Sequence, residues 1–313
     1  MKKLTIFCLS VLFILTACGN KADKVSNKED VSFGEMMNNG TKFFFIVDSD
    51  GESIGKDDQV HTVIKSQDGK ITTYNLSNTP VFDDEKMNDL SLGEVSKMSD
   101  KEIEKKARKG HKLTMDNIGV YSLALSNYIK NENISTFDVL TDDTNFVTRK
   151  NEIGKHTIDD QTKEFSQNDY NKSMKYVEKA KKENIFKETT QPYKLNIKVE
   201  SDDSGNQTSK ERFNIGPAGN GRINDFNYTD AETKDDVINI LSRNYKLPKN
   251  NYLSFNGGSI KKIYDTNFGY MIESNDSDDD MDTPKTKLVT KVGKKVNNVV
   301  NDKPDSKYVK EDN

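Results

Sequence analysis

Residues 59–76 read QVHTVIKSQDGKITTYNL and contain two strand-like runs on either side of a tight turn. The runs 59–65 and 71–76 are rich in Val, Ile, Thr and Tyr, the residues favoured on a pleated surface. The Asp68-Gly69 dipeptide between them favours the two positive φ angles of a type I′ turn. The stretch therefore predicts a β-hairpin.

Working outward, the run TKFFFIV at 41–47 precedes this hairpin and ends at the turn residues DSDG. Together the three runs predict an antiparallel meander. Further strands are predicted from alternating or β-branched runs at 137–140, 145–149, 193–199, 208–215, 252–255 and 259–272. The predicted fold class is α+β, mainly antiparallel β-sheet with a few short helices.

Two helix starts carry the capping-box pattern or a close relative of it. Ser99 followed by Glu102 predicts a short charged helix over 100–109, ended by Gly110. Ser166 with Asp169 predicts a helix near 167–184. A third helix is predicted over 230–245, while 118–129 fits both helical and alternating periods, and its β-rich setting favours a strand.

The composition is polar for a globular chain. Of 313 residues, 33% are hydrophobic and 31% charged, which indicates solvated segments beside a modest core. The 47 Lys and Arg against 51 Asp and Glu give a net charge of −4. Nucleic-acid-binding proteins are usually clearly basic, so this balance argues against that class.

The first residues have the organisation of an export signal. Met1-Lys2-Lys3 is basic, and the run 4–15 (LTIFCLSVLFIL) is apolar. A spanning helix needs about 20 residues, so the run fits the shorter core of a secretory signal. It ends in Leu15-Thr16-Ala17-Cys18.

This ending resembles the lipobox of bacterial membrane lipoproteins. The Lys- and Asn-rich composition of the chain is also similar to that of surface lipoproteins of low-GC Gram-positive bacteria whose roles are uncharacterised. The resemblance implies cleavage between Ala17 and Cys18 and a diacylglycerol thioether on the Cys18 sulfur. The new amino group of Cys18 is then a further acylation site, for example for palmitate. It also implies a place on the extracytoplasmic face of the cell membrane, with membrane lipid as the partner of Cys18. An ordinary secretory signal with a chance cysteine is the alternative.

Cysteine usage limits the chemistry of the processed chain. Cys8 and Cys18 are the only cysteines, so cleavage before Cys18 leaves no second thiol. Disulfides, thiolate metal sites and a cysteine nucleophile are then excluded.

The predicted organisation has five segments. They are a signal peptide at 1–17, a flexible tether at 18–32, an N-terminal β-rich domain at 33–165, a helix with a C-terminal β-rich domain at 166–275, and a charged, largely disordered tail at 276–313. Within the tail, 288–300 (LVTKVGKKVNNVV) reads either as disordered or as a basic amphipathic stretch for an anionic membrane or cell-wall polymer.

Four patterns in the sequence are candidate chemical sites. Gly51-x-Ser53-x-Gly55 matches a hydrolase nucleophile elbow, but a strand rather than the required helix is predicted to follow. The aspartates at 276, 278, 280 and 282 lack the Gly and Glu of a calcium loop. The Gly-rich stretch 216–221 matches no phosphate-binding motif. His61, His111 and His156 are too scattered to predict a metal site.

The sequence therefore predicts a lipid-anchored, non-catalytic binding or interaction module without cofactor, metal or nucleic-acid partner. Its ligand or protein partner stays open. The alternatives are a solute-binding lipoprotein of a transporter, and a cell-envelope hydrolase using Ser53. Exposed Tyr and Phe residues would suit a glycan- or peptide-binding face, but their alternation with polar residues favours a place in the core.

Overall fold

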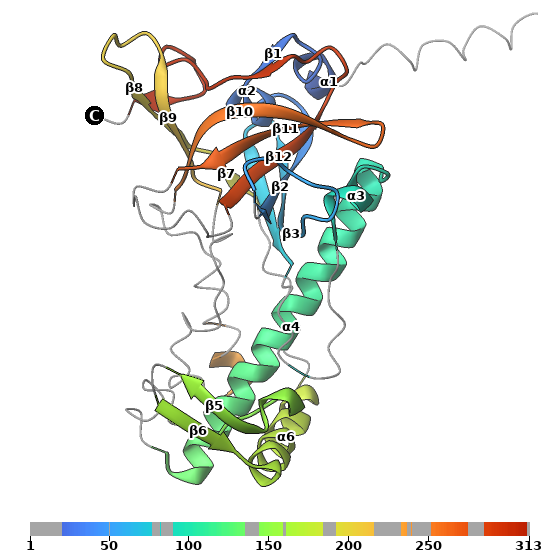
Figure 1. Ribbon diagram of the computed structural model, residues 1–313, viewed down its shortest axis with the longest axis vertical. Helices are drawn as coiled ribbons and strands as arrows, with labels where there is room; N and C mark the ends of the chain where they lie inside the picture. Colours follow the sequence, from blue (N-terminus) through green and yellow to red (C-terminus); the bar gives the residue numbers. More distant parts are fainter. Residues whose placement is uncertain are drawn as a thin grey trace, which may run out of the picture.

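The computed structural model places a large sheet at one end of the molecule and a smaller helical body at the other, joined by one long helix (Figure 1). It describes residues 21–49, 51–76, 82, 90–134, 144–158, 161–183, 192–215, 233–236, 239, 252–274 and 285–311.

Within the described residues, ten strands form one sheet in the order β14-β8-β9-β10-β11-β12-β2-β3-β4-β7. All neighbours are antiparallel except β14 and β8. The predicted α+β class with a mainly antiparallel sheet is thus confirmed. The strands are β2 (Thr41–Ser49), β3 (Val60–Gln67), β4 (Lys70–Asn75), β7 (Tyr193–Lys194), β8 (Ile197–Ser201), β9 (Thr208–Phe213), β10 (Leu253–Ile263), β11 (Thr266–Glu273), β12 (Lys285–Val292) and β14 (Lys310–Glu311).

The predicted hairpin is β3–β4. Gln67 pairs with Lys70, and the residues between them, Asp68 and Gly69, have φ angles of 49° and 76°. These values fit the type I′ turn that the sequence predicts. The Asp68 carboxylate also accepts a hydrogen bond from Gly40 N–H at 2.8 Å, which ties the turn to the start of β2.

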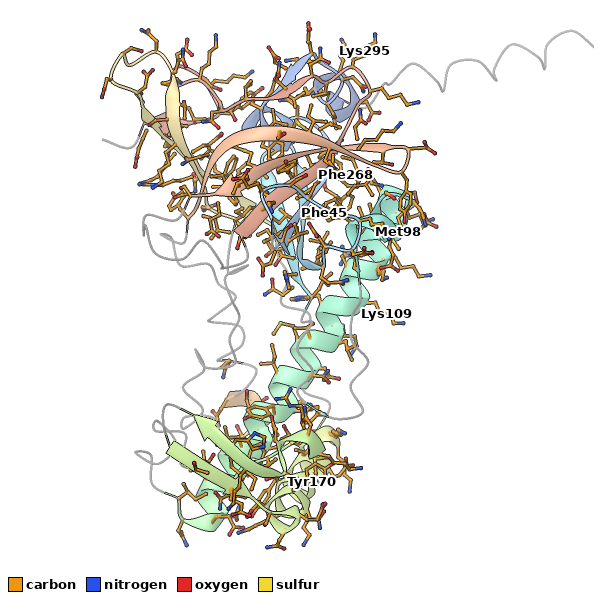
Figure 2. The ribbon with its side chains drawn as sticks, viewed as in Figure 1. Phe45, Met98, Lys109, Tyr170, Phe268 and Lys295 are labelled. Carbon is orange, nitrogen blue, oxygen red and sulfur yellow. The ribbon has the colours of Figure 1, made fainter. Side chains whose placement is uncertain are left out.

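The apolar run in β2 is buried on both faces of the sheet. Phe44 and Ile46 join one core cluster, beneath α2 (Phe33–Met37), and Phe43 and Phe45 join another, beneath α3 (Leu92–Val95) and the start of α4 (Asp100–Glu132). A strand covered on both faces needs no polar alternation, which explains the continuous run. Figure 2 labels Phe45 and Phe268, which lie in the same cluster.

The helix α4 is longer than the sequence predicts. It begins at the predicted Ser99 capping box, continues through Gly110, and ends at Asn133, which adopts a left-handed conformation with φ 53°. The prediction of a strand over 118–129 is therefore wrong. Buried residues form a helical stripe from Ile103 to Met115, first against the sheet, and from 118 to 128 they cover most of the helix surface where it packs beside α6.

The smaller body lies at the far end of α4. The predicted second helix is α6 (Gln167–Lys181), with the Ser166 box in place, and it packs on α4 through Val177 and Ala180. A two-stranded hairpin, β5 (Gly154–Ile158) with β6 (Gln161–Phe165), completes this body and was not predicted. Residues 145–149 form no strand, although the backbone N–H of Val147 donates to Ser173 Oγ at 3.0 Å.

Residues near both ends of the chain belong to the folded sheet body. α1 (Lys21–Val25) and β1 (Asp30–Val31) bury Ala22, Val25 and Val31, so the expected tether is folded from Lys21 onward. β12 lies between β11 and β2, and β13 (Asn298–Val299) pairs with β1. The predictions of a disordered tail and of a basic amphipathic stretch are therefore wrong for residues 285–311, because apolar side chains of this segment fill the core.

The expected domain boundary at 165/166 does not divide the sheet, since strands from both sides of it pair together. The smaller body, with α4, forms the second unit instead. The predicted strand at 137–140 lies outside the described residues, as does most of the predicted helix at 230–245. Among the described residues no helix is long and apolar enough to span a membrane.

Candidate functional site

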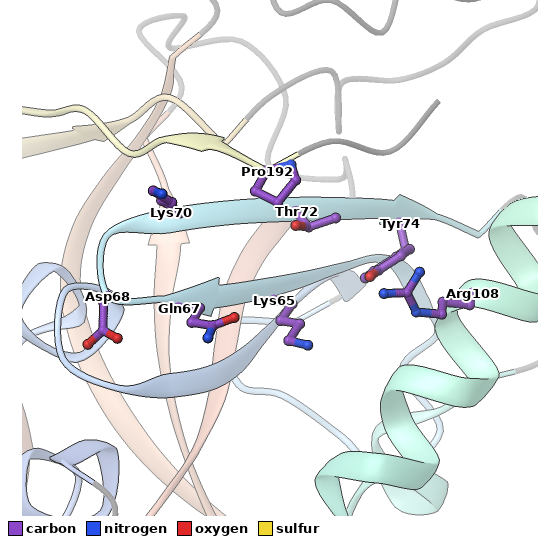
Figure 3. Close-up of a pocket in the computed structure, with 8 residues that line it drawn as sticks. All are labelled: Lys65, Gln67, Asp68, Lys70, Thr72, Tyr74, Arg108 and Pro192. Atoms are coloured by element: carbon purple, nitrogen blue, oxygen red, sulfur yellow. The ribbon is translucent and has the colours of Figure 1, made fainter. Parts of the chain in front are cut away.

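A pocket of about 500 Å³ lies on the β3–β4 hairpin beside α4. Figure 3 shows Arg108 reaching from α4 toward the strands, while Pro192 closes the opposite side. The lining residues are Lys65, Gln67, Asp68, Lys70, Thr72, Tyr74, Arg108 and Pro192.

The register of the hairpin explains why these side chains share one face. Lys65 is directly opposite Thr72, and Gln67 is opposite Lys70. One step further along the same face, Val63 is opposite Tyr74, and both are buried near the start of α4. The face thus changes from apolar to polar toward the Asp68-Gly69 turn, and the polar part is the floor of the pocket.

Glu104 on α4 holds two of the pocket cations. Its carboxylate accepts hydrogen bonds from Lys65 Nζ at 2.9 Å and from Arg108 Nη2 at 2.9 Å. Burial alone would raise the pKa of Glu104, but these two bonds outweigh it and hold the pKa below its ordinary value. The Arg108 guanidinium also lies 5.5 Å from the centre of the Tyr74 ring. These two contacts place the Arg108 guanidinium above the floor.

The charge of the pocket suits an anion. Lys65, Lys70 and Arg108 contribute three positive charges, against Asp68 in the lining and Glu104 behind it. Lys70 is exposed and has no ion-pair partner within the described part of the chain. Cationic and amide donors around one hollow are the groups that recognise a carboxylate or phosphate.

A second polar feature is a buried pair of carboxyl groups. Glu211 on β9 is fully buried, and Asp302, between β13 and β14, is 4% exposed. Asp302 accepts hydrogen bonds from Ser32 Oγ at 2.7 Å and from Gly34 N–H at 2.8 Å. Its own backbone N–H donates to Glu211 Oε2 at 3.3 Å.

Burial raises the pKa of both carboxyl groups, and most strongly that of Glu211, where the neighbouring Asp302 charge adds to the effect. The two donors from Ser32 and Gly34 stabilise negative charge on Asp302, so Glu211 is the group that retains the proton. The pair joins the C-terminal segment to β9 and to the start of α2. A hollow of about 430 Å³ borders Asp302.

The structure places Ser53 in an exposed loop between β2 and β3. Its hydroxyl donates only a 3.5 Å contact to the carbonyl of Ile54, and its carbonyl accepts from Ser49 Oγ at 3.1 Å. The next described element is β3, so the helix that a nucleophile elbow requires is not there.

The three histidines are separate in the structure as well. His61 Nε2 lies 3.3 Å from Asp48 Oδ2, the buried His111 accepts a hydrogen bond from Asn75 N–H at 3.1 Å, and the His156 ring packs near Phe165. No group of three or more His, Cys, Asp or Glu among the described residues could hold a metal ion.

Other predicted sites lie outside the described residues. These are Ala17 and Cys18 at the cleavage and lipidation site, the Gly-rich stretch 216–221, and the aspartates at 276–282. Among the described large hydrophobic residues only Tyr264 and Val300 are exposed, so most of the described aromatic side chains lie in or against the core.

The pocket residues were not predicted from the sequence. A signal was available in the hairpin: once Gln67 pairs with Lys70, four polar residues must share one face of an otherwise apolar sheet. Arg108 had no such signal, because its place depends on how α4 crosses the sheet.

Comparison with protein-family models, with curated proteins and with solved structures found no match to this chain.

Proposed function

We propose that this protein is a lipid-anchored, non-catalytic binding module on the extracytoplasmic face of the cell membrane. The anchor is a diacylglycerol on Cys18, as the lipobox resemblance implies. The ligand is an anionic group, carboxylate or phosphate, bound in the pocket on β3 and β4. The observation that carries the ligand class is the placement of Lys65, Lys70 and Arg108 around that pocket in a chain of net charge −4.

The geometry supports binding more than catalysis. The pocket holds cations and amides, and within its lining no histidine or pair of carboxyl groups is available for proton transfer. The serine hydrolase alternative is disfavoured by the loop around Ser53. The described strands form one main sheet rather than two α/β lobes, which disfavours the transporter alternative.

The anchor is tested by metabolic labelling with a fatty acid. The unaltered chain should incorporate label and move to the membrane fraction. Cys18→Ala should lose the label and leave uncleaved or released protein, because the thioether requires the thiol. Unchanged labelling in that variant would refute the anchor.

The ligand class is tested by calorimetric titration of the solubilised, processed protein. Glycerol 3-phosphate is the anionic probe and glycerol the neutral one. Lys70→Ala should weaken binding of the anion by about ten- to a hundredfold, since charged hydrogen bonds contribute about 1.5–3 kcal/mol. Lys109→Ala is the matched control, an exposed lysine of α4 that does not line the pocket. Equal binding of glycerol, or no effect of Lys70→Ala, would refute an anion site.

A further inference from the structure

The fold begins very close to the proposed anchor. Only three peptide units separate Cys18 from Lys21, where α1 starts. Even fully extended, they span at most about 11 Å. α1 cannot swing away from the sheet body, because Ala22 and Val25 are buried. The membrane surface that holds Cys18 must therefore lie near α1.

A second segment shares this end of the sheet body. The turn between β12 and β13 packs against the residues that follow α1: Gly293 N–H donates to Ser26 O at 2.8 Å, and Asn297 N–H to Glu29 O at 2.7 Å. The fit is close, since a Cβ on Gly293 would lie 1.8 Å from Asn27 Oδ1. Lysines of this turn consequently lie beside α1.

Exposed lysines gather on these two segments. We call Lys21, Lys24, Lys294 and Lys295 the anchor-side lysines, and all four are exposed. Asp23 on α1 is the one acidic residue between Lys21 and Lys24. In the residues that follow α1, Lys28 pairs with Glu35 at 2.5 Å, and Glu29 and Asp30 accept hydrogen bonds from Asn297 and Asn298.

We infer that the anchor-side lysines rest on the anionic headgroups of the membrane that holds the protein. This inference relies on the proposed lipidation of Cys18. The reach of about 11 Å from Cys18 to Lys21 is close to the Debye length of about 8–10 Å in physiological salt, so the surface potential acts on the charges at this end of the sheet body. Basic residues next to a membrane anchor are attracted to anionic lipid in this way.

Such docking sets the orientation of the whole molecule. Figure 2 shows Lys295 and Tyr170 at opposite ends of the longest axis. α4 has 33 residues and is therefore about 50 Å long. With the anchor-side lysines on the membrane, α4 carries α6 and the β5–β6 hairpin outward, away from the bilayer.

The test uses the processed, lipidated protein in vesicles. Cys18 is blocked by its thioether and Cys8 is removed with the signal, so one added cysteine is the only thiol. Lys295→Cys and, as the distal control, the exposed Lys175→Cys of α6 each receive a polarity-sensitive dye. Quenching by acrylamide is compared in phosphatidylcholine vesicles with and without phosphatidylglycerol.

At position 295, phosphatidylglycerol should lower the quenching constant at least twofold, with no change at position 175. Adding Lys21→Glu, Lys24→Glu and Lys294→Glu to the labelled Lys295→Cys protein should abolish the shielding while the far-ultraviolet circular dichroism stays the same. Equal quenching in both vesicles, with Cys18 lipidated, would overturn the docking alone. Absence of lipid on Cys18 would overturn the anchor and the docking together.

Discussion

The backbone N–H of Asp302 donates a hydrogen bond to Glu211 Oε2 at 3.3 Å, and the two carboxyl groups lie together inside the sheet body. Two ionised carboxylates in such a place repel each other and lose hydration, so the arrangement requires a proton. This requirement makes the stability of the fold sensitive to pH.

We expect the free energy of unfolding to fall as pH rises above about 4.3, the ordinary pKa of Glu. In this range the unfolded chain releases the Glu211 proton while the folded chain retains it, because burial raises the folded pKa. The contribution is fully present below the unfolded pKa, and it is lost at about 1.4 kcal/mol per pH unit up to the folded pKa. Urea unfolding at about pH 5 and about pH 8 measures this fall.

Glu211→Gln has no proton to lose at this site and should remove much of that fall, leaving the variant more stable than the unaltered chain at the higher pH. The exposed Glu183→Gln is the control and should follow the unaltered chain. Parallel pH profiles for Glu211→Gln and the unaltered chain would contradict a proton retained on Glu211.

Two truncations should show which part of the C-terminal segment the fold requires. Removing residues 285–313 deletes β12 from between β11 and β2, so the shortened chain should lose cooperative unfolding. Removing only residues 310–313 deletes the edge strand β14 and should leave a cooperative transition. Circular dichroism during urea unfolding distinguishes these results. A cooperative transition for the chain ending at residue 284 would show that β12 is dispensable.

Gly258 has no room for a side chain. A Cβ at this position would lie 2.5 Å from Val299 Cβ and 2.7 Å from the Val299 carbonyl oxygen. Gly258→Ala should therefore destabilise the fold by about 1–3 kcal/mol, the usual cost of overpacking. Gly51→Ala is the matched control, since nothing described lies within 4 Å of its added Cβ. Similar unfolding midpoints for the two variants would contradict the close approach of β13.

The start of α4 depends on its cap. Ser99 Oγ accepts a hydrogen bond from Glu102 N–H, and the Glu102 carboxylate accepts from Ser99 N–H at 2.8 Å. Ser99→Ala should lower the free energy of unfolding by about 1 kcal/mol, and Ser99→Asp should recover most of it, because Asp is an equally good N-cap. If both variants lose the same stability, the role of Ser99 is not capping.

Local patterns were sufficient for the β3–β4 hairpin and for the starts of α4 and α6. A type I′ turn needs only its Asp-Gly dipeptide, and a capping box needs only four consecutive residues. These elements are specified by neighbours in the chain, and the structure contains them where the sequence predicts them.

The sequence predictions that are wrong concern segments whose structure depends on contacts with distant parts of the chain. Residues 118–129 fit two periods, and their packing against α6 selected the helix. Likewise, 285–292 carries three lysines and two valines, a composition that suits a tail as well as a strand, and only its pairing with β2 and β11 orders it. Lys291 shows the difference, because its ammonium donates to the Met98 carbonyl at 2.6 Å and its burial lowers its pKa.

The amino-acid sequence alone was enough for the α+β class, the hairpin around Asp68-Gly69 and the two capped helix starts, because each depends on interactions within a few residues. The position of β12, the full length of α4, the Glu211–Asp302 pair and the pocket beside Arg108 were decided by tertiary structure. Each depends on residues far apart in the chain, such as Thr286 and Asp48, whose side chains meet at 3.1 Å across 238 positions. The burial of these residues and their contacts with charged groups arise only once the sheet has formed, and no local sequence pattern specifies them.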